Sequence, residues 1–220
     1  MTEAVGRLEA LLTSIYDLRV DCRVADFLVT DRQSLPGECR DAPGDEQLFV
    51  TTVDEELCMS LYLDPALLER LKRRDPHDAL DADNVADCWT ALEGVSHFLC
   101  VAHHAGHDRP VSRLTLELQA EIDKYVASFL LLCRSDPRRF PAELHALLFR
   151  QASIDPVLAA GREPLYRRAS RYAARFCGRL EPALRAFCRR EDGSWLADLR
   201  RFYRLSDNGK LRLIERLAPA

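Results

Sequence analysis

The sequence lacks the glycine-rich and histidine-rich motifs that mark several common enzyme folds. It contains no GxxxxGK[ST], no GxGxxG and no GxSxG among its 220 residues. Phosphate-loop nucleotide hydrolases, dinucleotide-binding folds and α/β-hydrolases therefore have no support. The HExxH pattern of zinc peptidases is also missing. A function has to be inferred from the arrangement of single side chains instead.

The sequence also lacks a long apolar run. The longest nearly uninterrupted one covers residues 126–133, whereas a membrane-spanning helix needs about 20 apolar residues. The first 20 residues carry the acidic side chains Glu3, Glu9 and Asp17 and have neither the basic start nor the apolar centre of a signal peptide. We therefore expect a cytoplasmic protein without membrane contact.

Paired cysteine motifs are missing too, although the chain has eight cysteines. There is no CxxC, and most of the cysteines lie in apolar runs such as "SFLLLC" and "ARFC". Cysteines in such positions usually act as small buried hydrophobic residues in a reducing compartment. We expect reduced structural thiols rather than a framework of disulfides.

Charge is divided unevenly along the chain, which has a net charge of −4 and only three lysines. Residues 1–110 hold 10 Lys and Arg against 22 Asp and Glu, and residues 111–220 hold 21 against 13. The two halves attract each other in the folded chain, or the basic half faces an anionic partner. The first interpretation is favoured because the acidic half would repel nucleic acid.

Length and composition fit a single domain covering 1–220, with an N-terminal region at 1–76 and a helical region at 77–220. The apolar spacing of residues 2–18 predicts a first helix. Three β-prone stretches follow, and the last two read as a hairpin. We expect these stretches, 24–30, 47–53 and 57–63, to form a small antiparallel sheet.

The rest of the chain predicts helices, the most apolar of which cover 83–106 and 113–133. A short turn joins these two, so they should form a central antiparallel αα-hairpin. Pro182 is expected to end or kink the helix that begins near Pro164. The predicted fold class is therefore α+β, predominantly α, with the small sheet packed on a bundle of about six helices.

Two polar stripes on the central helices are the most informative feature. One carries Glu93, His97, Cys100 and His104, and the other carries Glu117, Glu121, Lys124 and Ser128. Antiparallel pairing around the turn predicts that Glu93 faces Lys124 and that His97 faces Glu121. Glutamate and histidine on facing helices are typical of metal and acid–base sites in bundles.

Three interpretations of these stripes remain open. They can form a structural network that fixes the pairing of the helices. They can be a catalytic site of Glu93, His97, Glu121 and Lys124. No metal site or cofactor is favoured, because His97, Cys100 and His104 extend about 10 Å along one helix. If a transition metal binds at all, we expect its ligands to come from four residues: His97, Cys100, His103 and His107.

A second candidate site is an arginine stripe with tyrosines beside it in the basic half. It predicts an anion- or partner-binding surface formed by Arg168, Arg171, Arg175 and Tyr172. The leading prediction of function is a cytoplasmic, non-enzymatic protein that binds a protein partner or forms a homo-oligomer. The alternatives are a helical-bundle enzyme or metal-binding protein, and nucleic-acid binding through the arginine-rich half, which is less favoured but possible.

Overall fold

The structure is a computed structural model, and it describes residues 3–35, 37–40, 43–151, 161–189 and 194–217. The helices are α1 (Glu3–Tyr16), α2 (Gly37–Arg40), α3 (Pro65–Arg73), α4 (Val85–Ala105), α5 (Arg113–Ser135), α6 (Leu144–Ala146), α7 (Glu163–Cys188), α8 (Trp195–Tyr203) and α9 (Asp207–Glu215). The strands are β1 (Leu28–Val29), β2 (Glu46–Val53) and β3 (Glu56–Leu63). The fold class is α+β and predominantly helical, as predicted.

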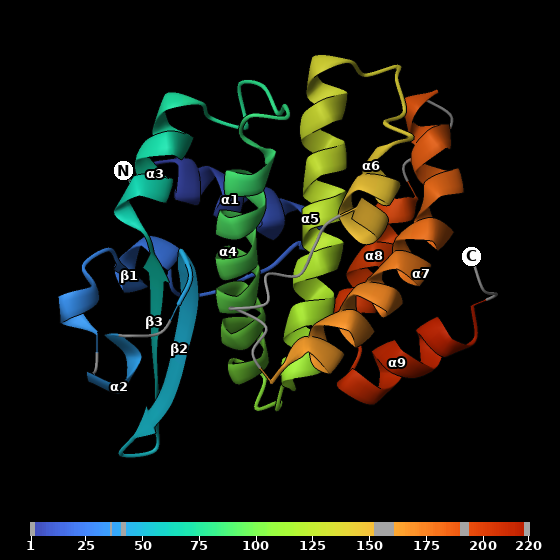
Figure 1. Ribbon diagram of the computed structural model, residues 1–220. Helices are drawn as coiled ribbons and strands as arrows, with labels where there is room; N and C mark the ends of the chain where they lie inside the picture. Colours follow the sequence, from blue (N-terminus) through green and yellow to red (C-terminus); the bar gives the residue numbers. More distant parts are fainter. Residues whose placement is uncertain (1–2, 36, 41–42, 152–160, 190–193, 218–220) are drawn as a thin grey trace.

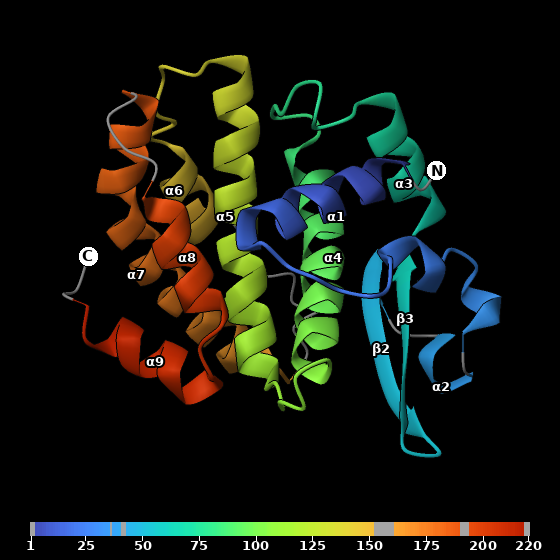
Figure 2. The same ribbon diagram turned by 180° about the vertical axis from the view of Figure 1, so that it is seen from behind.

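The elements form successive layers around α4 and α5 (Figure 1). The sheet packs on one side of α4, α5 packs on the other side, and α7 lies against α5. Helix α1 crosses behind α4 and α5, as Figure 2 shows from the opposite side. One continuous hydrophobic core runs through these layers from α1 to α9. No helix in the described part of the chain is both long and apolar enough to cross a bilayer.

The sheet is mixed, which corrects the prediction that it is entirely antiparallel. Strands β2 and β3 form the predicted antiparallel hairpin, turning at Asp54 and Glu55, which both have positive φ. The predicted strand at 24–30 instead begins with a 3-10 turn at Val24–Phe27, and only Leu28–Val29 are extended. This short β1 pairs parallel with β3, so the strand order is β1-β3-β2.

The central αα-hairpin is present with nearly the predicted bounds. Helix α4 is buried over much of its circumference, because the sheet, α1 and α5 all pack against it. The side chain of Ser112 accepts a hydrogen bond from the backbone N–H of Thr115 and so caps the start of α5. The short turn between the two helices sets which side chains of α4 and α5 face each other.

Helix α7 is longer than predicted, because it continues through Pro182 to Cys188. Leu180 and Leu184, on either side of the proline, are both buried in the core. Their burial continues the apolar face of α7, and this offsets the backbone hydrogen bond that Pro182 cannot donate. Between α5 and α7, the short helix α6 is followed directly by a π-helical turn at Leu147–Gln151.

Candidate functional site

A cavity of about 900 Å³ lies beside α4 and is lined by most residues of the two polar stripes of the central helices. Strand β2, helices α4 and α5 and the start of α7 contribute to its lining. Six of its ionisable residues form one cluster, five of them on α4 and α5 and one on β2. They are Glu46, Glu93, His97, Glu117, Glu121 and Lys124.

Glu46 is the first residue of β2 and reaches the cavity from the sheet. The sheet approaches α4 closely at Gly94, where a Cβ atom would lie 2.8 Å from Cγ of Glu46 and 2.8 Å from Cδ1 of Leu61. Only glycine allows this separation without a shift of its neighbours. Because position 94 has no side chain, Glu46 can approach α4 closely and lie beside Glu93, the residue that precedes Gly94.

Lys124 lies between two carboxylates and donates to both. Its Nζ atom is 2.6 Å from Oε2 of Glu93 and 2.9 Å from Oε1 of Glu121. The predicted contact of Glu93 with Lys124 is therefore present. Burial alone would raise the pKa of Glu93, but the charges of Lys124 and His97 outweigh it and lower that pKa. The same two carboxylates raise the pKa of Lys124 despite its burial, so the ammonium group stays charged.

His97 lies between two other carboxylates, one beside each ring nitrogen. Its Nδ1 atom is 3.9 Å from Oε1 of Glu46, and its Nε2 atom is 3.6 Å from Oε2 of Glu117. His97 thus faces Glu117, whereas the sequence predicted that it would face Glu121. Glu121 instead binds Lys124 on its own helix. Burial lowers the pKa of His97, but Glu117 and Glu46 together raise it well above its usual range.

The cluster has an excess of negative charge and unsatisfied hydrogen-bonding groups. Four carboxylates face one lysine and one histidine. Oε1 of Glu46 and Nε2 of His97 are buried without a hydrogen-bond partner. Burial raises the pKa of Glu46, while His97 opposes the shift. Buried polar groups normally have partners, so this part of the cavity is suited to a bound cation.

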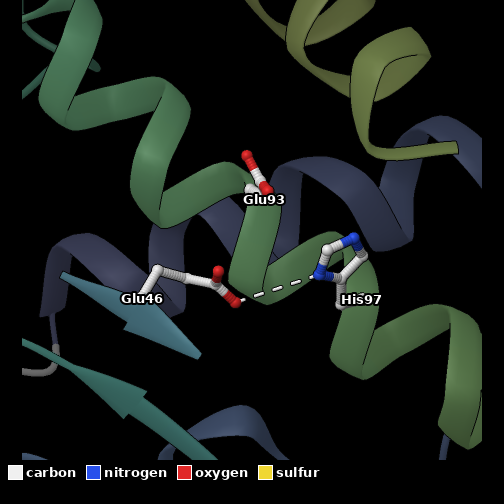
Figure 3. Close-up of side chains that lie close together, drawn as sticks. All are labelled: Glu46, Glu93 and His97. Atoms are coloured by element: carbon white, nitrogen blue, oxygen red, sulfur yellow. Dashed lines mark ion pairs between the residues drawn. The ribbon is translucent and has the colours of Figure 1, made fainter. Parts of the chain in front are cut away.

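Three ligand atoms converge at this point, as Figure 3 shows for the side chains of Glu46, Glu93 and His97. One oxygen of each glutamate and one ring nitrogen of His97 all lie within 4.8 Å of one another. One histidine nitrogen with two carboxylate oxygens is a donor set that suits Mn²⁺, Fe²⁺ and Zn²⁺. Within the described ranges, no other group of three His, Cys, Asp or Glu residues converges in this way.

The alternative ligands named from the sequence do not meet at one point. Of His97, Cys100, His103 and His107, only His97 belongs to the converging group. Cys100 is buried, and its thiol contacts Nδ1 of His104 at 3.7 Å. His103 lies in the last turn of α4 and His107 just after the helix, and their rings are 4.5 Å apart. Burial and then the neighbouring His107 lower the pKa of His103 to about 4.

The arginine stripe on α7 has mostly internal partners. Tyr172 is buried and donates a hydrogen bond of 3.0 Å to Glu215, and Arg175 donates to the backbone oxygen of Leu217. These contacts hold the end of α9 against α7. Arg168 lies over the ring of Tyr172, 5.5 Å from its centroid, and Arg171 is exposed. None of the four residues lines the cavity, and the anion- or partner-binding role of this stripe stays a prediction.

A second buried polar cluster, which the sequence did not predict, consists of residues that do not line the cavity. Asp123 of α5 accepts hydrogen bonds from Ser96 at 2.6 Å, from Gln119 at 2.8 Å and from Tyr16. Lys210 of α9, also fully buried, donates to the side-chain oxygen of Gln119 at 2.8 Å. Each member has a partner within the cluster, so these residues join α1, α4, α5 and α9.

The predicted site did not include Glu46, which belongs to the converging group, or Glu117, which lies beside His97. Glu117 was recognised in the polar stripe of its helix but was not selected, because the pairing placed His97 one turn further along. Glu46 lies in a strand, about 50 residues before Glu93 in the sequence. Only the glycine at position 94 indicates that the strand and α4 meet there.

The comparisons with known proteins give no relative to which this site can be matched. No family model matches the chain, and no curated protein or solved structure matches it either. The chemistry of the cavity is therefore the basis for a proposed function.

Proposed function

We propose that this protein binds a divalent first-row transition metal ion through Glu46, Glu93 and His97. The observation that carries the proposal is the convergence of three ligand atoms within 4.8 Å of one another. Metal–ligand distances of about 2.0–2.2 Å place such atoms slightly closer together, and small side-chain rotations can supply the difference. A bound cation would also compensate the excess carboxylates of the cluster.

Glu117 supports the proposal by its position on the far side of the imidazole. A histidine that binds a metal through one ring nitrogen usually donates its other N–H to a carboxylate or carbonyl. Nδ1 of His97 faces Glu46, and Nε2 faces Glu117. Glu117 would thus orient the ring and fix its tautomer, and the metal would replace the proton on Nδ1.

The number of ligands and the cavity indicate a metal that acts on a bound molecule. Structural zinc sites usually have four protein ligands, whereas catalytic sites usually have three and an open position. Glu46, Glu93 and His97 supply three, and the cavity beside them has a volume of about 900 Å³. We therefore propose a metal-dependent binding or catalytic protein, which is the enzyme or metal alternative predicted from the sequence.

Titration of metal-free protein with Zn²⁺ or Co²⁺, followed by calorimetry, tests the proposal. We expect one ion per chain, and we expect Glu46→Gln and His97→Gln each to weaken binding at least 100-fold. Co²⁺ adds a spectroscopic readout, because its visible absorption reports coordination by the protein. Stoichiometric binding by both variants with wild-type affinity would overturn the proposal.

The matched control for the histidine variant is His103→Gln. His103 lies on the same helix, two turns nearer its end, and belongs to the alternative ligand set. We expect this variant to retain wild-type affinity for Zn²⁺. Loss of binding in His103→Gln, with no loss in His97→Gln, would place the metal at the end of α4 and contradict the proposed ligands. Circular dichroism verifies that each variant is folded.

A protein partner or a homo-oligomer, together with a cytoplasmic location, remains a second proposal. One feature favours it: the apolar side chains of Val50, Val53 and Leu57 on the β2–β3 hairpin are 47%, 53% and 41% exposed. Strand β2 is also an edge of the sheet. The molar mass in solution tests self-association, and Val53→Asp should convert any dimer to monomer.

A further inference from the structure

The cavity that holds the proposed metal ligands is also lined by three arginines. Arg109 lies in the turn before α5, Arg113 is the first residue of α5, and Arg162 directly precedes α7. Arg109 donates a hydrogen bond of 3.1 Å to the backbone oxygen of Arg204. Cationic groups thus line the same cavity as the carboxylates, and they come from the turn before α5, from the start of α5 and from the residue before α7.

Arg113 has no carboxylate partner in the described part of the chain, although a glutamate lies one helical turn further along α5. Glu117 follows it by four residues on α5, a spacing that usually allows an ion pair. Five other arginine–glutamate pairs at this spacing are formed. Glu117 turns instead towards His97. The guanidinium of Arg113 therefore remains available at the edge of the cavity.

Arg162 has no ion pair among the described residues either, and Tyr166 lies one turn after it on α7. Tyr166 is half-buried, and both side chains line the cavity. Burial and then the charge of Glu117 raise the pKa of Tyr166, so its hydroxyl remains a neutral hydrogen-bond donor. Two guanidinium groups and a phenol thus line the cavity, at the start of α5, directly before α7 and in the first turn of α7.

The remaining lining is partly apolar and includes Phe49, Trp89 and Leu148. A cavity with apolar walls and a few convergent polar groups is typical of a site for a small organic molecule. Guanidinium groups bind carboxylates and phosphates through paired, charge-assisted hydrogen bonds. A metal ion with an open position binds the same kind of oxygen.

We infer that the cavity binds a small organic acid, whose carboxylate or phosphate group is held by Arg113 and Arg162. This inference deepens the proposed function: the oxyanion end contacts the arginines, and another oxygen of the same molecule completes the coordination of the metal. Tyr166 donates a hydrogen bond to the acid. The apolar residues of the cavity contact its carbon skeleton.

Calorimetric titration with inorganic phosphate and with malonate tests the inference and separates the two oxyanion types. Each is titrated into Zn²⁺-loaded protein and into metal-free protein. We expect at least one of them to bind, more tightly in the Zn²⁺-loaded form. Arg113→Gln and Arg162→Gln should each weaken that binding about tenfold, since each removes a charge-assisted hydrogen bond, and should leave Zn²⁺ affinity unchanged within about twofold.

Arg171→Gln is the matched control, because Arg171 is exposed on α7 and does not line the cavity. It should bind the acids as the wild type does. Binding that depends on Arg113 and Arg162, with or without Zn²⁺, supports the inference. Equal binding by all four proteins, or no binding of either acid in both forms, overturns it. The Zn²⁺ titration alone decides the metal site, so the two proposals can fail separately.

Discussion

Gly94 and the side chain of Glu46 are in direct contact: a Cβ atom on Gly94 would lie 2.8 Å from Cγ of Glu46 and 3.0 Å from its Oε1. Residue 94 directly follows Glu93 in the middle of α4, whereas residue 46 begins β2. The contact therefore brings Glu46 of β2 next to its fellow proposed ligand Glu93, at a position of α4 that has no side chain.

Replacement of Gly94 by alanine should weaken metal binding more than it affects the rest of the fold. The added methyl group requires Glu46 and Leu61 to shift, since real Cβ contacts are longer than 2.8 Å. We expect Zn²⁺ affinity to fall at least tenfold and stability to fall by about 1–3 kcal/mol, the usual cost of overpacking. Calorimetry and urea unfolding measure the two effects.

Gly6→Ala is the control for this substitution. A Cβ atom on Gly6 would meet nothing within 4 Å, and the residue lies inside α1. Alanine there should stabilise the helix by about 0.5–1 kcal/mol and leave Zn²⁺ affinity unchanged. Wild-type affinity in Gly94→Ala would show that the position of Glu46 does not matter for the metal.

The sequence predicted those parts of the site that depend on local pattern and a short turn. Helical spacing placed Glu93 and His97 on one stripe. Antiparallel pairing around residues 106–112 placed Glu93 opposite Lys124, and in the structure Nζ of Lys124 lies 2.6 Å from Oε2 of Glu93. The same reasoning placed the partner of His97 one turn too far along. The turn fixes only the approximate pairing of the helices. Glu117 and Glu121 lie one turn apart on α5, and the reach of the side chains decides which of them faces His97.

Features that depend on packing between distant segments could not be predicted. The position of Glu46 follows from the docking of the hairpin on α4, and no local pattern records that docking. The same holds for the parallel pairing of Leu28 with Leu61. Helix α7 passes through Pro182 because flanking leucines are buried against the core, an effect that local propensity does not include.

Replacement of Lys124 by methionine should destabilise the fold strongly in the absence of metal. It leaves Glu93 and Glu121 partly buried without their cation, and breaking a buried pair typically costs about 3–5 kcal/mol. A divalent ion binds near the same carboxylates. We therefore expect saturating Zn²⁺ to restore more stability to Lys124→Met than it adds to the wild type. Urea unfolding with and without Zn²⁺ measures both quantities.

Lys72→Met serves as the comparison, since Lys72 is exposed on α3. Its stability should change little, and Zn²⁺ should act on it as on the wild type. If Lys124→Met were no less stable than Lys72→Met, the pairs formed by Lys124 would have no structural role. If Zn²⁺ raised the stability of neither protein, the metal site itself would be contradicted.

Cys133 and Cys188 should form a disulfide when the folded protein is treated with diamide, which accepts the two electrons and two protons released. Their Sγ atoms lie 3.7 Å apart on α5 and α7, and all eight cysteines are free thiols in this structure. Burial raises the pKa of Cys133 to about 12, so the reaction should be slow at neutral pH, because the thiolate is the reactive form.

Mass spectrometry after alkylation should find these two cysteines protected together. Cys133→Ser should abolish the protection of Cys188. Cys177→Ser should leave the cross-link intact, since Cys177 lies about three turns before Cys188 on α7, roughly 16 Å along the helix axis. Random cross-links among all the cysteines would contradict the predicted pairing.

The pH dependence of stability should contain a contribution from Asp123. Burial raises the pKa of this carboxyl to about 6, although hydrogen bonds from Ser96, Tyr16 and Gln119 oppose the shift. In the unfolded chain its pKa is about 3.9. Between these two values the folded state binds more protons than the unfolded state, so stability falls as pH rises. The loss amounts to about 3 kcal/mol and is complete above about pH 6.

Asp123→Asn isolates this contribution, because the amide cannot ionise. The variant loses part of the hydrogen-bond network at every pH, since the amide nitrogen cannot accept from Ser96 or Gln119. That cost is constant, whereas the wild type loses stability between about pH 4 and 6. The variant should therefore become more stable relative to the wild type over this range, and the difference should stay constant above it.

Urea unfolding at pH 4, 5, 6 and 7 measures the difference, with Asp198→Asn as the control. Asp198 is exposed on α8, and its substitution should give a nearly pH-independent difference from the wild type. A constant difference for Asp123→Asn as well would mean that Asp123 is already ionised in the folded protein at pH 4. Lys210 would then be compensating its charge through Gln119, because no other cation lies within this buried cluster as described.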